Sequence, residues 1–350
     1  MLSVDYIRDR TVLVTGAAGT IGSALTERLL PVAKTVRCLD HAETELFFLH
    51  HRLARRGRLA PQLGDIRDLD RLRFAMSGVD VVFHTAALKH VGLGEYNPFE
   101  VVQTNLQGLN NVVRAALDAN VERVIFTSSD KAVNPTNVMG ASKLMGERLV
   151  IAANEIRGQR RTRFAAVRFG NVIGSRGSVV PILAGQLLRR EPLTITHAAM
   201  TRYIMTIEEA AALVLEAGEI MRGGEIFVTK MRALKVVDLA EAMAQLMTDG
   251  RYEKTTTGVR VGEKLYEELV AIEEIERTIE LERLLVIMPV EGTAHETGQL
   301  RAAYPEGRPL EREWNSSKGP TMTCAEIAAY LKEHRVLEPF VAPKATSEPA

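Results

Sequence analysis

The stretch Thr11–Gly22 (TVLVTGAAGTIG) combines a short apolar run with three regularly spaced glycines, and it is the strongest indication of the fold. Its first five residues are apolar or β-branched and predict a buried strand, and a helical pattern over residues 22–30 follows the last glycine. Gly16, Gly19 and Gly22 permit a tight turn and let the backbone approach a pyrophosphate closely. A diphosphate held there would lie at the positive N-terminus of the helix. The stretch therefore predicts a dinucleotide-binding strand–turn–helix unit.

An acidic residue ends the next predicted strand. Asp40 follows the run 36–39 and is expected to bind the adenosine ribose diol. A carboxylate there would repel a ribose phosphate, so the sequence favours NAD over NADP, although nearby basic side chains keep NADP open. These side chains are His41, Arg52, Arg55 and Arg56. Asp65 and Ile66, after the third strand, either frame the adenine or form an ordinary strand end.

Short β-branched runs alternate with helical periods through the first half of the chain. Such strands are typical of a parallel sheet covered on both faces, so we expect an α/β fold, a Rossmann-type doubly wound parallel sheet. The expected strands are 11–15, 36–39, 79–83, 121–127 and 162–173, and the expected helices include 22–30, 98–120, 181–190, 207–221 and 236–248. We expect residues 1–170 to form the NAD-binding domain, with later segments returning to it. Residues 171–340 are expected to form a smaller, mixed substrate-binding region, and residues 341–350 a disordered tail.

Composition and charge narrow the partners. The 350 residues carry 44 basic and 44 acidic side chains, so a mainly electrostatic hold on nucleic acid or an anionic membrane is not expected. No apolar stretch approaches the roughly 18 residues that span a bilayer, and residues 1–10 lack the apolar middle of a signal peptide. Cys38 and Cys324 provide neither a disulfide framework nor metal-ligand spacing. We therefore expect a cytoplasmic protein without a metal, whose partner is a small molecule.

The residues after the expected strand 121–127, which is the fifth when the strand before Asp65 is counted as the third, predict a catalytic stretch. The strand ends in Thr127-Ser128-Ser129-Asp130-Lys131, and the next helix carries Met139 and Lys143 on one face. With His84-Thr85-Ala86-Ala87 and the glycine spacing, this arrangement resembles the extended short-chain dehydrogenase/reductases, which normally have a YxxxK pair on this helix. Here the lysine is present and methionine occupies the tyrosine position. Because methionine cannot accept a proton, either the chain is inactive or another group performs the acid–base chemistry.

A longer set of motifs supports the second alternative. The segment 128–140 (SSDKAVNPTNVMG) is similar to nucleotide-sugar 4,6-dehydratases that act on UDP-N-acetylglucosamine, in which a Ser/Thr-Asp-Lys group follows the fifth strand. The resemblance spans about residues 8–270. It continues through Ala87–Val91, Tyr96–Glu100, Arg168–Val172, Gly174–Pro181, Met200–Tyr203 and Gly262–Tyr266.

The resemblance implies a role for each residue of the catalytic stretch. In that family NAD⁺ takes hydride from sugar C4 and returns it to C6 after water has left across C5 and C6. Lys131 is then the C5 base and Asp130 the C6 acid, and a partly desolvated pocket would favour the neutral form of both. Ser129 would orient the C4 hydroxyl, and Lys143 would bind the nicotinamide ribose. The acceptor of the O4 proton stays open between Ser129, Asp130 and a water.

Two sets of binding residues follow from the motifs and the resemblance. Those expected to hold NAD are Gly16, Gly19, Thr20, Ile21, Gly22, Asp40, Asp65, Ile66, Ala86 and Lys143. Those expected to hold a UDP-linked N-acetylhexosamine are Lys89, His90, Asn171, Ser175, Arg202, Arg260 and Glu263. Arginine suits a diphosphate because its planar guanidinium can donate hydrogen bonds to two phosphate oxygens. Each arginine taken alone is equally well explained as a solvated side chain on the surface. Val261 departs from the family, which usually has proline there.

The methionine also bears on the product. In larger, membrane-anchored relatives it accompanies retention at C5, so we expect UDP-2-acetamido-2,6-dideoxy-α-D-xylo-hexos-4-ulose, which would feed bacillosamine- or legionaminate-type glycans. The alternatives are a C5-inverting dehydratase, a GDP-linked substrate, a nucleotide-sugar 4-epimerase and a non-catalytic dinucleotide sensor. Asp130 and Lys131 count against the epimerase and the sensor. A homo-oligomer is expected, since short-chain relatives associate through helices beside the active-site helix.

Overall fold

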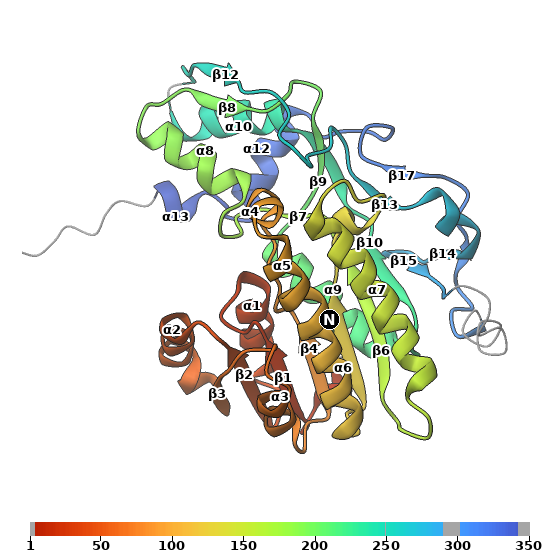
Figure 1. Cartoon of the computed structure of the whole chain (residues 1–350). Helices are drawn as coiled ribbons and strands as arrows, with labels where there is room; N and C mark the ends of the chain where they lie inside the picture. The colour runs from red at the N-terminus through yellow and green to blue at the C-terminus, as the bar shows by residue number, and fades with distance from the viewer. Residues whose placement is uncertain (1–3, 249, 290–301, 342–350) are drawn as a thin grey trace, which may run out of the picture.

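The computed structural model describes residues 4–248, 250–289 and 302–341. A large sheet has helices on both faces, and a smaller region lies over one end of it (Figure 1). Of the expected disordered tail, residues 342–350 lie outside the described residues. Within the described residues, no helix combines the length and apolar character that crossing a bilayer requires.

The large sheet has ten strands in the order β16-β14-β15-β10-β6-β5-β4-β1-β2-β3. The seven strands from β10 to β3 pair in parallel, whereas β15, β14 and β16 extend the sheet in antiparallel fashion. Because β1 and β4 are neighbours while the chain winds outward from each, the carboxyl ends of these two strands form the crevice where such sheets bind ligands. The strands are β1 (Thr11–Thr15), β2 (Thr35–Asp40), β3 (Leu59–Leu63), β4 (Val81–His84), β5 (Arg123–Thr127), β6 (Arg163–Arg168), β10 (Ile226–Thr229), β14 (Thr278–Glu280), β15 (Leu284–Ile287) and β16 (Arg308–Pro309).

Helices cover both faces of this sheet. One layer contains α1 packed on α9, and α9 lies against β5 and β6; the other contains α3, α6 and α7. The core between the layers is mainly apolar, with Phe83, Phe164 and Phe227 completely buried. The helices of this part are α1 (Thr20–Leu29), α2 (Glu43–Leu53), α3 (Leu69–Met76), α4 (Val91–Tyr96), α5 (Pro98–Val101), α6 (Gly108–Asp118), α7 (Val138–Ile156) and α9 (Ile207–Ile220).

The smaller region has its own core, in which α8, α10 and α12 pack together with the strands beside them. Its strands form the sheets β11-β9-β7, β12-β8 and β13-β17. They are β7 (Asn171–Val172), β8 (Leu193–Ile195), β9 (Thr201–Met205), β11 (Arg232–Lys235), β12 (Lys254–Thr256), β13 (Glu268–Val270) and β17 (Trp314–Asn315). The helices are α8 (Val179–Leu188), α10 (Val236–Met247), α12 (Cys324–Glu333) and α13 (Glu338–Val341). Across the part of the chain that the structure describes, the 3₁₀ turns are η1 (Asp5–Ile7), η2 (Ala54–Arg56), η4 (Asp130–Ala132) and η5 (Ile272–Arg277).

Two elements differ from the sequence expectation. The expected strand 162–173 breaks after β6, and its end crosses into the smaller region as β7, where a side chain on Gly170 would crowd Tyr203. The expected helix 98–120 is interrupted by the π-helical turn η3 (Val102–Gln107). This turn directs the Asn105 amide at the backbone of Leu88, to which it both donates and accepts hydrogen bonds. Single π turns of this kind occur frequently beside functional sites.

Candidate active site

The glycine turn brings backbone rather than side chains to the mouth of the sheet. Gly16 follows β1 with a φ of +67°, and a Cβ there would lie 2.6 Å from the amide nitrogen of Ala86. A Cβ on Gly22, in the first turn of α1, would collide with the carbonyl oxygen of Gly16. Gly19 is the N-cap residue of α1, so the first amides of the helix face the crevice without intrahelical partners. The turn is thus shaped for an anionic group at the helix terminus.

Asp40 supports this turn from the end of β2. One carboxylate oxygen accepts a hydrogen bond from the Ala18 amide at 2.9 Å, and the other accepts one from the Ala42 amide at 3.0 Å. The side chain also lines a cavity of about 410 Å³ together with Gly16, Gly19, Asp65, Ile66 and Ala86. Each carboxylate oxygen keeps further acceptor capacity, so the position suits a ribose diol.

Asp65 and Ile66 line the same cavity just after the end of β3, the strand that pairs with β2. Burial alone would raise the pKa of Asp65, but hydrogen bonds and the charge of Arg67, whose guanidinium is 2.7 Å away, hold the pKa below its usual value. The Ile66 side chain is buried and leaves no room for a Cβ on Gly108 of α6. The structure therefore brings Asp65 and Ile66 to the cavity wall, and their contact with an adenine stays a prediction.

A second cavity, of about 620 Å³, continues along the crevice from the first. The two share Gly19 and Arg176 among their lining residues, and Arg176 reaches the carbonyl oxygen of Ala18 on the glycine turn. The lining residues of the second cavity include ten of the predicted site residues besides the glycines: Thr20, Ile21, Lys89, His90, Ser129, Lys131, Met139, Lys143, Asn171 and Ser175. Together the two cavities fit the two halves of a dinucleotide, with the glycine turn between them.

Lys143 reaches this cavity from α7. Its ammonium donates a 2.8 Å hydrogen bond to the carbonyl oxygen of Thr127 and lies 4.8 Å from the centre of the Phe126 ring. Burial lowers the pKa of Lys143 to about 8, against the opposing charge of Glu147. Met139, one turn earlier on the same helix, is buried and lines the same cavity. A lysine with this pKa exists in both protonation states near neutral pH, whereas methionine holds no proton.

Asp130 and Lys131 lie in the short turn η4 that follows β5. The carboxylate of Asp130 is fully buried, and its Oδ1 accepts hydrogen bonds from the Ser129 hydroxyl at 2.8 Å and the Lys131 ammonium at 2.9 Å. Lys131 also donates to the Asn171 side chain at 3.4 Å, and 22% of the Lys131 side chain is exposed. Ser129, Asp130 and Lys131 thus form one hydrogen-bonded unit. Ser129 and Lys131 line the second cavity, whereas the Asp130 carboxylate is fully buried and does not line it.

The charge of Lys131 differs from the sequence expectation. Burial lowers the pKa of this lysine, as expected, but the carboxylates of Asp130 and Glu267 outweigh that effect and raise the pKa above its usual value. The prediction that the pocket makes Lys131 neutral is therefore wrong for this arrangement. The physical reason is the charge of two carboxylates together, first Asp130 and then Glu267, whose Oε1 lies 3.6 Å from the lysine nitrogen.

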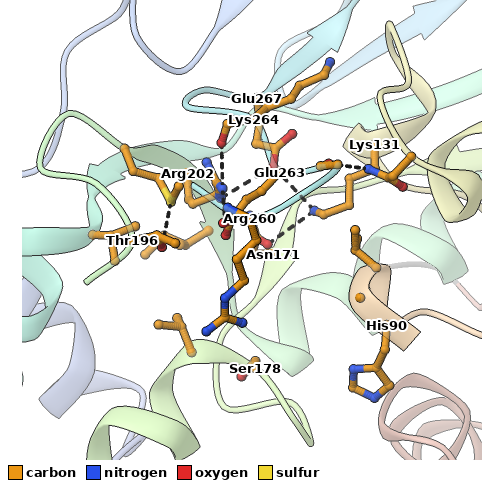
Figure 2. A pocket seen from close by; sticks show the side chains of 18 of the residues that line it. His90, Lys131, Asn171, Ser178, Thr196, Arg202, Arg260, Glu263, Lys264 and Glu267 are labelled. Atoms are coloured by element: carbon orange, nitrogen blue, oxygen red, sulfur yellow. Dashed lines mark hydrogen bonds and ion pairs between the residues drawn. The ribbon is translucent and has the colours of Figure 1, made fainter. Parts of the chain in front are cut away.

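A third cavity, of about 350 Å³, adjoins the catalytic stretch on the side of the smaller region (Figure 2). Arg260 extends into it toward Ser178, and Glu263 accepts a hydrogen bond from the Arg260 amide at 3.2 Å. Arg202 donates to the backbone carbonyls of Thr201 and Lys264. His90, Lys131 and Asn171 line this cavity and the second one, so the two meet at the catalytic stretch.

Lys89, His90 and Ser175 hold the loop that separates these spaces. The Lys89 ammonium donates to the carbonyl oxygen of Arg176 at 2.9 Å, and burial followed by the Arg176 charge lowers the pKa of Lys89. The His90 ring packs on Gly177, where a Cβ would lie 2.6 Å from the ring. Ser175 belongs to the loop itself, is buried, and lines the second cavity. Substrate contact by these three residues stays a prediction.

Sequence reasoning missed two residues of the site. Arg176 lies inside the motif Gly174–Pro181 but was not among the predicted site residues, whereas it lines both parts of the crevice. Glu267 follows directly after the motif Gly262–Tyr266, and its position there is the only sequence signal that could have pointed to it. The motif does not indicate that the loop carrying Glu267, although far from η4 in the sequence, folds against it.

Extended short-chain dehydrogenase/reductases combine this doubly wound sheet with a lysine on the helix after the fifth strand, and the chain is an enzyme of that class. Residues 12–289 match the family described as "Polysaccharide biosynthesis protein". The chain belongs to this family, which confirms the predicted resemblance.

Several relatives carry names that bear on function. "Uncharacterized membrane protein MJ1061" of Methanocaldococcus jannaschii is 49% identical over 81% of this chain and 87% of its own length. "UDP-N-acetylglucosamine 4,6-dehydratase (inverting)" of Campylobacter jejuni is 38% identical over 80% of this chain and 83% of its own. "UDP-glucose 4-epimerase" of Rickettsia felis is 39% identical, with 78% and 81% covered. The match to "Capsular polysaccharide biosynthesis protein CapD" of Staphylococcus aureus, 41% identical over 77% of this chain, spans only 46% of that protein.

Solved structures confirm the predicted fold class. "X-ray structure of Pen from Bacillus thuringiensis" superposes with a TM-score of 0.88 at 35% identity, covering 95% of this chain and 99% of that one. "MoeE5 in complex with UDP-glucose and NAD" has a TM-score of 0.64 at 26% identity, covering 72% and 87%. The predicted enzyme class and NAD cofactor agree with these relatives, one of which holds NAD in its crystal.

Proposed function

We propose that the chain is an NAD-dependent UDP-N-acetylglucosamine 4,6-dehydratase that retains the configuration at C5. The observation that carries the proposal is the 2.9 Å hydrogen bond between the buried carboxylate of Asp130 and Lys131, which lines both the second and the third cavity. The elimination needs a base at C5 and an acid at C6, whereas an epimerisation at C4 needs neither of these two groups. The dehydratase relative from Campylobacter jejuni supports the same substrate.

The residues of the crevice would hold the cofactor in two halves. The adenosine half would lie against Asp40, Asp65 and Ile66, the diphosphate at the glycine turn, and the nicotinamide half beside Lys143. When bound, NAD would supply the oxidation at sugar C4 and the later reduction at C6. Lys143, with its pKa lowered to about 8, would favour loss of the O4 proton through its charge.

The Asp130–Lys131 pair would perform the loss of water. Transfer of one proton from the ammonium to the carboxylate, across 2.9 Å, converts the ion pair into a neutral amine and a carboxylic acid without changing their total charge. The amine of Lys131 then takes the C5 proton, and the Asp130 acid protonates the departing C6 hydroxyl. These two transfers restore the ion pair, and Lys131 can return its proton to C5 when C6 has been reduced. That return leaves the pair one proton short, and the proton released from O4 when C4 is oxidised makes up the loss, so the complete reaction releases only water.

Met139 supports retention at C5. Inversion requires a proton donor on the face of the sugar opposite the base, and a methionine supplies none at its position. If Lys131 both removes and returns the proton, the hydrogen re-enters on the face from which it left. The product would then be UDP-2-acetamido-2,6-dideoxy-α-D-xylo-hexos-4-ulose, and its use in bacillosamine- or legionaminate-type glycans is part of this proposal.

A 4-epimerase is the second candidate, because the Rickettsia felis relative bears that name at 39% identity. Purified protein incubated with UDP-N-acetylglucosamine and NAD⁺ separates the two by mass spectrometry. A product lighter by one water supports the dehydratase. An isomer of equal mass supports the epimerase, and unchanged substrate contradicts both. GDP-N-acetylglucosamine, tested in parallel, determines which nucleotide the third cavity accepts.

Self-association is a further part of the proposal. Large apolar side chains are exposed on α4, α5 and α7, namely Leu93, Tyr96, Phe99 and Met145. Covering such side chains is a common driving force for forming symmetric oligomers. Light scattering on the purified protein should therefore give a mass of at least two chains. The free thiols of Cys38 and Cys324 agree with the reducing, cytoplasmic setting that we propose.

A further inference from the structure

Glu267 is a buried carboxylate that the mechanism above does not use. It lies on the loop before β13, and only 3% of its side chain is exposed. Its Oε1 lies 3.6 Å from the Lys131 ammonium and 3.5 Å from Nε of Arg202 (Figure 2). The loop is held in place by Ser316, which accepts the amide hydrogen of Glu267 and donates its own amide to the Glu267 carbonyl. The carboxylate is thus fixed between two cations of the site.

The second oxygen of this carboxylate has an unusual environment. Oε2 of Glu267 and Oδ2 of Asp130 are both buried, and neither has a hydrogen-bond partner within the described residues. A buried polar atom without a partner costs free energy, and a protonated oxygen is one way to lower that cost. Two carboxylates that face one lysine therefore form a group whose protons are shared, with Lys131 between them.

Charges face Glu267 from three elements. Asp130 and Lys131 belong to η4, Arg202 to β9, and Lys264 to the same loop. Burial and then the charge of Asp130 raise the pKa of Glu267, and they outweigh the three cations, which lower it. Glu267 in turn stabilises the ammonium form of Lys131. The protonation of the acid–base pair thus depends on a residue outside the pair.

We propose that Glu267 is a positioning residue of the elimination site, which holds Lys131 and Arg202 in register and sets the proton affinity of the Asp130–Lys131 pair. This inference rests on the proposed function, because it assigns Glu267 to the same reaction. The Asp130–Lys131 pair can catalyse the elimination while the lysine amine and the aspartate carboxylate hold one proton between them. The alkaline limit of activity is then the pH at which the pair loses that proton, and Glu267 moves this limit upward.

The variant Glu267→Gln tests the proposal, since it removes the charge and keeps the shape. The primary measurement is the titration of Lys131 by NMR on protein with ¹³C-labelled lysine, with the signal assigned through Lys131→Arg. We expect the apparent pKa of Lys131 to fall by about one unit or more in Glu267→Gln. Glu268→Gln is the matched control, because Glu268 is the adjacent residue but faces Lys264 and Asn134 instead. It should leave the titration of Lys131 in place.

Activity supplies the second measurement. The alkaline limb of the kcat profile should move to lower pH in Glu267→Gln, and Glu267→Asp, which keeps the charge, should return it part of the way. An unchanged Lys131 titration in a folded Glu267→Gln protein overturns the inference, as does an equal shift in Glu268→Gln. If Glu267→Gln does not fold, Glu267→Asp must alter the titration for the inference to stand. The titration needs no substrate, so a failure of the proposed function, seen as no loss of water by the wild type, is distinguished from a failure of this inference.

Discussion

Replacing Lys131 by arginine separates the charge of this residue from its chemistry. The guanidinium keeps a cation between Asp130 and Glu267, which lie 2.9 Å and 3.6 Å from the lysine nitrogen. An arginine stays protonated throughout the accessible pH range, so it cannot act as a base. The substitution should therefore preserve the buried ion pair and abolish proton removal from C5.

The structure allows both effects to be given a magnitude. Loss of a positioned general base lowers the rate by about 10²–10⁴, which corresponds to a rise of roughly 3–5 kcal/mol in the barrier. The free energy of unfolding should change by no more than about 1 kcal/mol, because the charges remain paired. Lys131→Met is the contrasting variant, since it leaves Asp130 buried without its cation and should cost about 3 kcal/mol of stability.

Turnover and unfolding are measured on the same preparations. Steady-state loss of water from UDP-N-acetylglucosamine gives the rate, and urea denaturation gives the stability. The absorbance of reduced nicotinamide should still rise in Lys131→Arg, because oxidation at C4 precedes the step that the lysine performs. Turnover of Lys131→Arg within tenfold of the wild type would refute the reasoning, and so would equal stabilities of the arginine and methionine variants.

Three further variants test other parts of the structure. Gly16→Ala should lower the free energy of unfolding more than Gly78→Ala, which should cost only about 1–2 kcal/mol. Both glycines have a positive φ, but only a side chain at Gly16 would clash with another backbone segment. Equal losses of stability and of NAD binding in the two variants, measured by denaturation and NAD titration, would contradict this reasoning. Asp40→Asn should weaken NAD binding about tenfold and improve NADP binding relative to NAD. Calorimetry with both cofactors measures this change, and an unchanged preference for NAD over NADP would contradict the role of the carboxylate. Glu274→Gln should cost about 3 kcal/mol at neutral pH, because Arg168 is buried between Glu274 and a second carboxylate. The charge of Arg168 holds the pKa of Glu274 below its usual 4.5 despite burial, so this stability is present above pH 4.5 and is lost as the pH falls through the lowered pKa; a loss independent of pH would contradict it.

The parts of the fold that depend on local sequence were predictable. The strand–turn–helix at Gly16–Gly22 follows from the chemistry of glycine and from a strand buried on both faces, and Asp40 follows from its place at the next strand end. The interruption of the helix at Val102–Gln107 was not predictable, because Asn105 is drawn inward by the backbone of Leu88, a partner that no helical pattern reveals. Tertiary hydrogen bonds overrode the local preference there.

The candidate site shows the same division. Asp130, Lys131 and Lys143 come from one short segment, so the sequence placed them together before the structure did. The charge of Lys131 could not be derived in that way, because it depends on Glu267 in a loop of the smaller region. Burial was foreseen correctly, but the carboxylates of Asp130 and Glu267 together outweigh its effect on the pKa. Electrostatics within a site depends on every charge that the fold brings near, including those far along the chain.

Solvent-deuterium incorporation tests whether Lys131 removes the C5 proton and returns one to C5. The Lys131 ammonium carries deuterons in D₂O, and the account has this group return the proton to C5. Wild-type protein incubated in D₂O with UDP-N-acetylglucosamine and NAD⁺ should therefore give a sugar that has lost one water and carries deuterium at C5, with the configuration retained, and Lys131→Arg should give neither. A dehydrated product with its original C5 hydrogen, or deuterium entering C5 as readily in Lys131→Arg, would contradict the assignment of the acid–base pair.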